Sequence, residues 1–217
     1  MSSISTVAGI DVGGERKGCH MVILRGTTVL FTTKSKAMKD LLERCLAFDV
    51  VAVGVDAPCR WGRDGAGRHA ERELARQGIF CFATPTRKLA LSNSSRFYGW
   101  MFSGERVYQT FASMYPLFVA GNYSKGRVCF ETFPHAITCA MLGKEVASAK
   151  QKRPQRREIL ESAGIEAAGL KSIDAVDAAL CALTARYLLE GKTVAYGDVA
   201  GGHIVVPVPN AQRHSSA

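Results

Sequence analysis

Four aspartates of this chain lie where a charged side chain is costly. Asp11 interrupts the apolar run 7–12, Asp56 ends the apolar run 50–56, and Asp174 and Asp177 open a helix of small residues. A carboxylate beside a buried strand must be paired, hydrogen-bonded or metal-bound, because desolvating a bare charge costs several kcal/mol. Carboxylates that converge usually hold a divalent metal ion. The pattern therefore indicates a metal site.

Each aspartate, taken alone, also has a structural explanation. Asp11 could close the glycine turn that follows it, Asp56 could be a simple strand-end residue, and Asp174 could complement the helix dipole. Asp177 is harder to explain, because it lies one turn deeper, where the benefit of the dipole has faded. It shares a helix face with Asp174, and two like charges side by side are unfavourable unless a cation or hydrogen bonds offset them.

The elements predicted around these residues bring the four acids together. Residues 7–12, 19–24 and 28–33 are predicted to form an antiparallel meander, followed by a helix over 36–48 and a strand over 50–55. A right-handed crossover places the first and fourth strands side by side and parallel, so Asp11 and Asp56 become neighbours. A helix capped by Ser172 and closed by Gly191 would pack on this sheet and add the other two acids. Such a cluster fits two-metal catalysis, with ions about 3.5–4 Å apart.

The remainder of the chain is predicted to support one domain, 1–217, with an insertion at about 57–125. Within the insertion we expect helices over 66–77 and 106–120, separated by a loop over 85–99. After the insertion, the sequence predicts a strand over 127–133, a helix over 136–142, a basic run over 147–157, short strands over 193–196 and 203–206, and a disordered tail at about 210–217.

The formal net charge of +9 favours an anionic partner such as nucleic acid. The insertion is rich in arginine and aromatic residues, which can bind phosphates and stack on unpaired bases. The alternative is that its helix carries a solvated stripe of arginines paired with glutamates, and that its aromatics fill a small core. The residues predicted to contact nucleic acid are Arg60, Arg63, Arg68, Arg87 and Lys88.

Glu131 is a fifth acid that could belong to the site. It lies within a predicted strand, between Phe130 and Phe133, and either points into the cleft or pairs with an arginine of the insertion. We expect the cleft position, and therefore count Glu131 among the candidate catalytic residues. The seven cysteines are scattered and form no C-x-x-C pair, which favours reduced thiols over a zinc site or disulfides. With no signal peptide or membrane-length apolar stretch, a cytoplasmic protein without membrane contact is expected.

The order and spacing of four short motifs resemble a known family. Residues 9–13 (GIDVG), 55–58 (VDAP), 130–134 (FETFP) and 174–178 (DAVDA) resemble the DUF429 family, often described as predicted ribonuclease H-like nucleases. The last motif is similar to the paired-aspartate helix of RuvC-type Holliday-junction resolvases. The resemblance implies an α/β fold with a ribonuclease H-like mixed sheet, Asp11, Asp56, Asp174 and Asp177 as ligands of Mg²⁺ or Mn²⁺, and the option of a dimer. RuvC-type enzymes usually carry Glu at the second position, where this chain has the shorter Asp56.

The leading hypothesis is a divalent-metal-dependent nuclease that hydrolyses phosphodiester bonds of DNA or RNA. One alternative is a phosphotransferase, because residues 10–14 (IDVGG) also resemble the first phosphate loop of actin-like ATPases and sugar kinases. No second D-x-G-G turn accompanies it. The other alternative is a non-catalytic nucleic-acid-binding module that keeps the fold and the basic insertion.

Overall fold

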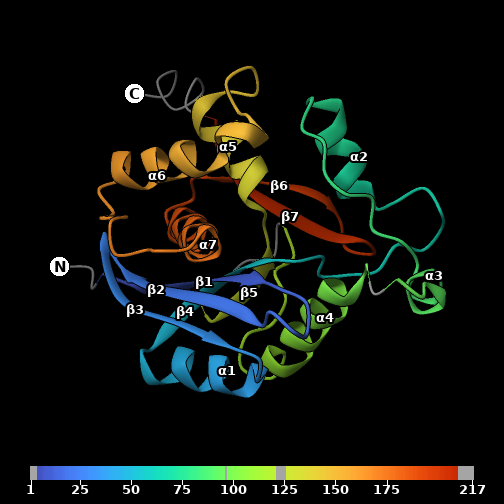
Figure 1. Cartoon of the computed structure of the whole chain (residues 1–217), viewed down its shortest axis with the longest axis horizontal. Helices are drawn as coiled ribbons and strands as arrows, with labels where there is room; N and C mark the ends of the chain where they lie inside the picture. Colours follow the sequence, from blue (N-terminus) through green and yellow to red (C-terminus); the bar gives the residue numbers. More distant parts are fainter. Residues whose placement is uncertain (1–3, 96, 121–125, 210–217) are drawn as a thin grey trace.

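A computed structural model describes residues 4–95, 97–120 and 126–209 of the chain. A mixed seven-stranded sheet runs through it, in the order β3-β2-β1-β4-β5-β7-β6 (Figure 1). The strands are β1 (Thr6–Val12), β2 (Cys19–Arg25), β3 (Thr28–Ser35), β4 (Val50–Asp56), β5 (Val128–Glu131), β6 (Thr193–Asp198) and β7 (Gly202–Pro207). The predicted tail at 210–217 and the end of the insertion at 121–125 lie outside the described residues.

The pairing of the first four strands follows the prediction. β1, β2 and β3 form the antiparallel meander, and β4 lies parallel to β1. β5 continues the sheet parallel to β4, and β7 is parallel to β5, while β6 returns antiparallel to β7. The predicted fold class, an α/β mixed sheet with a three-stranded antiparallel meander and parallel strands flanked by helices, is confirmed by this arrangement.

Helices cover both faces of the sheet (Figure 1). On one face α7 packs into a core with α5 and α6, and on the other α1 and α4 pack over β1 and β4. The helices are α1 (Met38–Ala47), α2 (His69–Arg76), α3 (Arg87–Ser92), α4 (Gly99–Phe111), α5 (Pro134–Leu142), α6 (Lys152–Ser162) and α7 (Ile173–Leu189), with a 3₁₀ turn η1 (Ala149–Gln151).

The closest contact between the layers lies between α7 and the two central strands. A Cβ atom at Gly9 would lie 2.0 Å from the carbonyl oxygen of Ala178, and one at Gly54 would lie 2.5 Å from that of Cys181. Only glycine permits this approach. The small residues of α7 complete the fit, and the helix is thereby held against β1 and β4 with its first turn beside their carboxyl ends.

The insertion departs from the prediction in its helix boundaries. The stretch expected to be a loop, 85–99, contains α3, which Thr86 caps by accepting a hydrogen bond from the backbone N–H of Leu89. The helix predicted over 106–120 is α4 instead, which begins at Gly99 and ends at Phe111. Beyond it the chain leaves the helical path, and Tyr115 donates its hydroxyl hydrogen to the carbonyl oxygen of Val50, 2.9 Å away. The hydrophobic periodicity of the sequence gives no sign of this hydrogen bond between Tyr115 and Val50.

Much of the basic run over 147–157 forms η1 and α6. No helix among the described residues is long and apolar enough to span a membrane.

Candidate metal centre and nucleic-acid interface

Two of the predicted acids meet at the carboxyl ends of neighbouring parallel strands. Asp11 of β1 and Asp56 of β4 are direct partners in the register of the sheet. Asp11 is buried, with 9% of its surface exposed, and Asp56 is only partly exposed. The crossover through α1 produces this adjacency, as the right-handed rule required.

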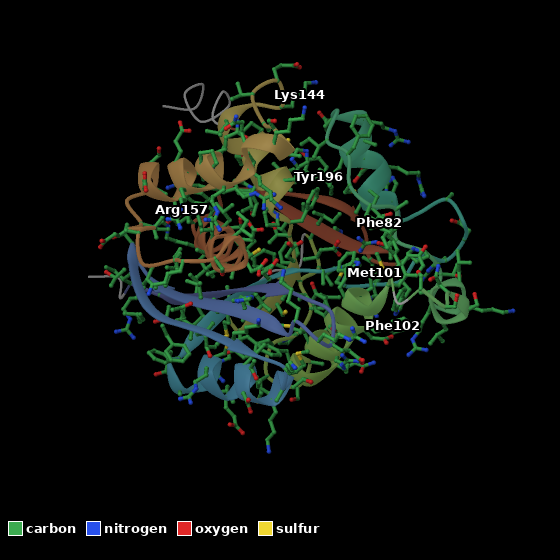
Figure 2. All side chains as sticks on the ribbon, viewed as in Figure 1. Phe82, Met101, Phe102, Lys144, Arg157 and Tyr196 are labelled. Carbon is green, nitrogen blue, oxygen red and sulfur yellow. The ribbon has the colours of Figure 1, made fainter. Side chains whose placement is uncertain are left out.

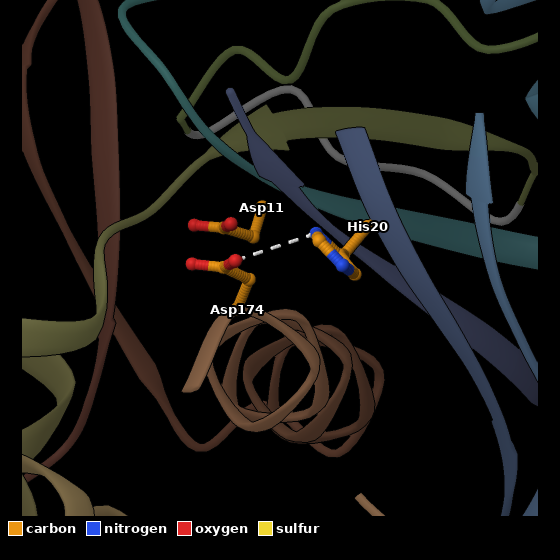
Figure 3. Close-up of side chains that lie close together, drawn as sticks. All are labelled: Asp11, His20 and Asp174. Carbon is orange, nitrogen blue, oxygen red and sulfur yellow. Dashed lines mark ion pairs between the residues drawn. The ribbon is translucent and has the colours of Figure 1, made fainter. Parts of the chain in front are cut away.

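The other two acids reach the same place from α7. Ser172 caps this helix, as predicted, by accepting a hydrogen bond from the backbone N–H of Ala175. Asp174 lies in its first turn and Asp177 lies one turn further along, buried. Figure 3 shows the carboxyl groups of Asp11 and Asp174 next to one another. The structure thus brings together all four aspartates that the sequence singled out.

Burial and mutual repulsion both disfavour the charged forms of these groups. Burial, reinforced by the charges of Asp177 and Asp174, raises the pKa of Asp11 to about 7. Burial and the neighbouring Asp11 likewise raise the pKa of Asp56 well above its usual range. The pKa of Asp177 is also raised by burial, although Arg156 opposes the rise. A cation bound among these groups would favour their charged forms.

Two basic side chains already neutralise part of the cluster. The Lys17 Nζ atom lies 2.6 Å from Oδ1 of Asp174. The Arg156 Nη1 atom lies 2.6 Å from both carboxylate oxygens of Asp177. Lys17 comes from the turn between β1 and β2, and Arg156 comes from α6. Neither residue was predicted to contact the acids.

His20 adds a nitrogen atom to the site from β2. It is the register partner of Asp11, and its Nδ1 atom lies 3.7 Å from Oδ2 of Asp174 (Figure 3). Asp11, His20 and Asp174 each offer one potential ligand atom, and these atoms lie within 4.8 Å of one another. Nδ1 of His20 is buried and has no hydrogen-bond partner in the described part of the chain. Burial lowers the pKa of this imidazole, partly opposed by Asp174, which favours the neutral form that binds metals.

The donor set therefore fits a divalent ion such as Mg²⁺ or Mn²⁺. Carboxylate oxygens are the preferred ligands of both ions, and a neutral imidazole suits Mn²⁺ better than Mg²⁺. The orphaned nitrogen of His20 and the raised pKa values of the acids are the two observations that support this fit.

Glu131 pairs with an arginine of the insertion, which was the less favoured interpretation. Its carboxylate receives two hydrogen bonds from Arg68, at 2.5 and 2.6 Å, and one from the backbone N–H of Cys59 at 2.8 Å. The glutamate lines a cavity next to Asp56, but its oxygens are engaged. This engagement argues against the catalytic role that we expected for Glu131.

The prediction that Arg68 contacts nucleic acid is wrong, because this side chain is buried. It is 4% exposed, and besides Glu131 it contacts Glu71, whose Oε1 atom lies 2.8 Å from its Nε. A buried guanidinium between two carboxylates cannot reach a phosphate in solution. The sequence spacing of arginines on α2 misled the prediction, because Arg68 is the N-cap residue and turns inward.

The other predicted basic residues are exposed, at separate places. Arg87 lines an open cavity of about 940 Å³ and pairs with Glu105, with its Nε 2.9 Å from Oε1. Lys88 lies exposed on α3, Arg63 lies in an exposed loop, and Arg60 lines a smaller cavity with Trp61.

The large cavity lies between the β1–β2 turn and the α3–α4 segment. Its basic lining residues are Arg16, Lys17, Arg87 and Arg106, opposed by Glu15 and Glu105. Lys17 links this cavity to the acid cluster through Asp174. Positive charge thus lies next to the carboxylates.

Sequence reasoning missed three residues of the site, and one of them had a readable signal. The short turn between the first two strands sets Asp11 opposite His20, so the predicted meander was sufficient to place the histidine. Lys17 was assigned to a turn only. Arg156 was hidden in a basic run, because nothing in its sequence distinguishes it from its exposed neighbour Arg153.

Together, the sheet order, the covering helices and the four converging aspartates define a mixed-sheet α/β protein with a carboxylate-rich site. The chain belongs to the DUF429 family, described as a protein of unknown function, whose model matches residues 9–200. No curated protein matches the sequence.

Two solved structures from Thermus thermophilus are similar. The first is RuvC, with 18% identity and a TM-score of 0.44, and the second is RuvC in complex with a Holliday junction substrate, with 19% identity and a TM-score of 0.42. Each alignment covers 86% of this chain and 96% of the other.

Proposed function

We propose that this protein is a divalent-metal-dependent nuclease that hydrolyses phosphodiester bonds in DNA or RNA. The observation that carries the proposal is the convergence of Asp11, Asp56, Asp174 and Asp177 from β1, β4 and α7. A cluster of acids on the surface would be well hydrated, but here Asp11 and Asp177 are buried, and burial together with neighbouring carboxylates raises the pKa of Asp11 and Asp56.

The residues proposed to hold the metal are these four aspartates, with His20 as an additional nitrogen ligand. When bound, the metal would polarise the scissile phosphate and lower the pKa of a water molecule, which supplies the nucleophile. The carboxylates fix the position of the positive charge, and the close packing of α7 on Gly9 and Gly54 keeps that position rigid.

Nucleic acid is the proposed partner. The basic lining of the large cavity would hold the phosphates that flank the scissile bond. The residues involved are Arg16 and Lys17 of the β1–β2 turn and Arg106 of α4. Lys17 has a second role in this scheme, because its contact with Asp174 connects the phosphate path to the acids.

The direct test is cleavage of a panel of single-stranded, duplex and branched DNA and RNA, with Mg²⁺, with Mn²⁺ and with EDTA. We expect metal-dependent products that disappear in Asp11→Asn. The matched control is Asp40→Asn, since Asp40 is an exposed acid on α1 whose hydrogen bond with Ser35 an asparagine can keep. Pure protein that cleaves nothing, or cleavage that Asp11→Asn retains, would contradict the proposal. Stabilisation by ATP without cleavage would favour the phosphotransferase alternative instead.

A further inference from the structure

A second cavity, of about 350 Å³, begins at Asp56 and extends under the insertion. Aromatic side chains form much of its lining, namely Phe80, Phe82, Trp100 and Phe133. Phe82 lies on the same side of the molecule as Met101 and Phe102 (Figure 2). The cavity is distinct from the basic one, and the two share no lining residue.

The charges around this cavity select against an anion. Glu71 and Glu131 lie in its wall with one cation, Arg68, between them, and Asp56 lies at the same cavity. His135 also lines it, and burial together with Arg156 lowers the pKa of that imidazole, which favours its neutral form. A phosphate would meet uncompensated negative charge here, whereas an uncharged ring would not.

The walls have the features that a planar, polar-edged ring requires. Phe80 is 73% exposed and Phe82 is 44% exposed, although both are large and apolar. Thr132 lines the same cavity, is fully buried, and its hydroxyl oxygen has no hydrogen-bond partner among the described residues. A buried hydroxyl without a partner is destabilising, and a hydrogen-bonding group bound in the cavity would satisfy it. Aromatic faces combined with an unsatisfied hydroxyl fit a nucleobase better than an aliphatic ligand.

We propose that this cavity binds an unpaired nucleobase of the substrate strand. The inference rests on the proposed nuclease function, because Asp56 belongs both to this cavity and to the acid cluster. A base held here places its own or the adjacent phosphate at the acids, while the flanking phosphates follow the basic cavity. A base paired in a continuous duplex cannot enter, so the substrate class is single-stranded or branched nucleic acid with unpaired nucleotides.

The experiment is equilibrium binding of the full chain to a fluorescein-labelled single strand of DNA or RNA, and to the duplex of the same length, with Ca²⁺ to prevent cleavage. A second set of strands carries 2-aminopurine, whose fluorescence is quenched when it stacks. The variant is Phe80→Ala combined with Phe82→Ala. The control is Leu89→Ala, which removes another exposed apolar side chain of the insertion, 54% exposed, outside this cavity.

We expect the double variant to bind the single strands about 5- to 150-fold more weakly and to lose the quenching, because base stacking contributes about 1–3 kcal/mol per base. Duplex binding and the control should remain unchanged. The DNA and RNA strands identify which nucleic acid supplies the base. Unchanged single-strand affinity in the double variant, or no quenching in the wild type, would overturn the inference, even if the protein cleaves DNA in the assay above. Quenching without any cleavage would contradict the nuclease and leave the base site standing.

Discussion

Replacing Arg156 should make the stability of this protein depend on divalent metal. The Arg156 Nη1 atom lies 2.6 Å from both oxygens of Asp177, and the two side chains are 11% and 10% exposed. Removing one partner of a buried ion pair leaves a charge without compensation and costs about 3–5 kcal/mol. In Arg156→Gln the remaining carboxylate also faces Asp11 and Asp56, so we expect a loss of this size in metal-free protein.

The assay is thermal unfolding of the wild type and Arg156→Gln in EDTA and then in excess Mn²⁺. For a chain of 217 residues, the expected loss corresponds to about 6–20 °C in Tm. Mn²⁺ should raise the Tm of the variant more than that of the wild type, because the ion replaces the missing positive charge, and a ligand at 100 times its Kd contributes about 2.7 kcal/mol.

Arg153→Gln is the matched control, since Arg153 is exposed on the same helix. It should change neither the Tm in EDTA nor the response to Mn²⁺. Equal increments from Mn²⁺ in the wild type and in Arg156→Gln would refute the reasoning, because they would show that Arg156 and the metal do not neutralise the same acids.

Asp11, Gly9 and Arg16 each give a further prediction. In metal-free protein the pKa of Asp11 is about 7, against an ordinary 3.8, so between these values the folded state holds a proton that the unfolded state has released. The free energy of unfolding should therefore fall as the pH rises from about 4 to about 7. Denaturation in EDTA should show a shallower fall for Asp11→Asn, and parallel pH profiles would contradict this prediction. Gly9→Ala should lower the free energy of unfolding in urea by about 3 kcal/mol or more, because its Cβ would overlap the carbonyl oxygen of Ala178, whereas Gly65→Ala, which has no neighbour within 4 Å, should cost little. Arg16→Gln should reduce the salt slope of nucleic-acid binding by about 1 if Arg16 contacts a phosphate, and an unchanged slope would remove it from the interface.

The positions of the four acids could be predicted because they depend on strand order and helix register alone. The meander, the crossover and the cap at Ser172 each have a local signal in the sequence, and the parallel register then sets Asp11 beside Asp56. The pairing of His20 with Asp11 follows from the antiparallel register of β1 and β2.

The partners of the acids could not be predicted, because they depend on tertiary contacts between distant segments. Arg156 lies 21 residues from Asp177, and Lys17 lies 157 residues from Asp174. For Arg68 the prediction failed in the opposite way, because a buried ion-paired residue was expected to be exposed. It appeared to belong to an exposed basic stripe, but it is buried between Glu71 and Glu131, an arrangement that only the packing of α2 against the sheet determines.

The central claim is that the converging carboxylates bind divalent metal, and diffraction from crystals grown with Mn²⁺ tests it most directly. The account predicts anomalous peaks at about 2.0–2.2 Å from oxygens of Asp11 and its neighbouring aspartates, with His20 turned toward one ion. Saturating Mn²⁺ with no anomalous peak among these side chains, and with Arg156 and Lys17 still paired to the acids, would contradict it.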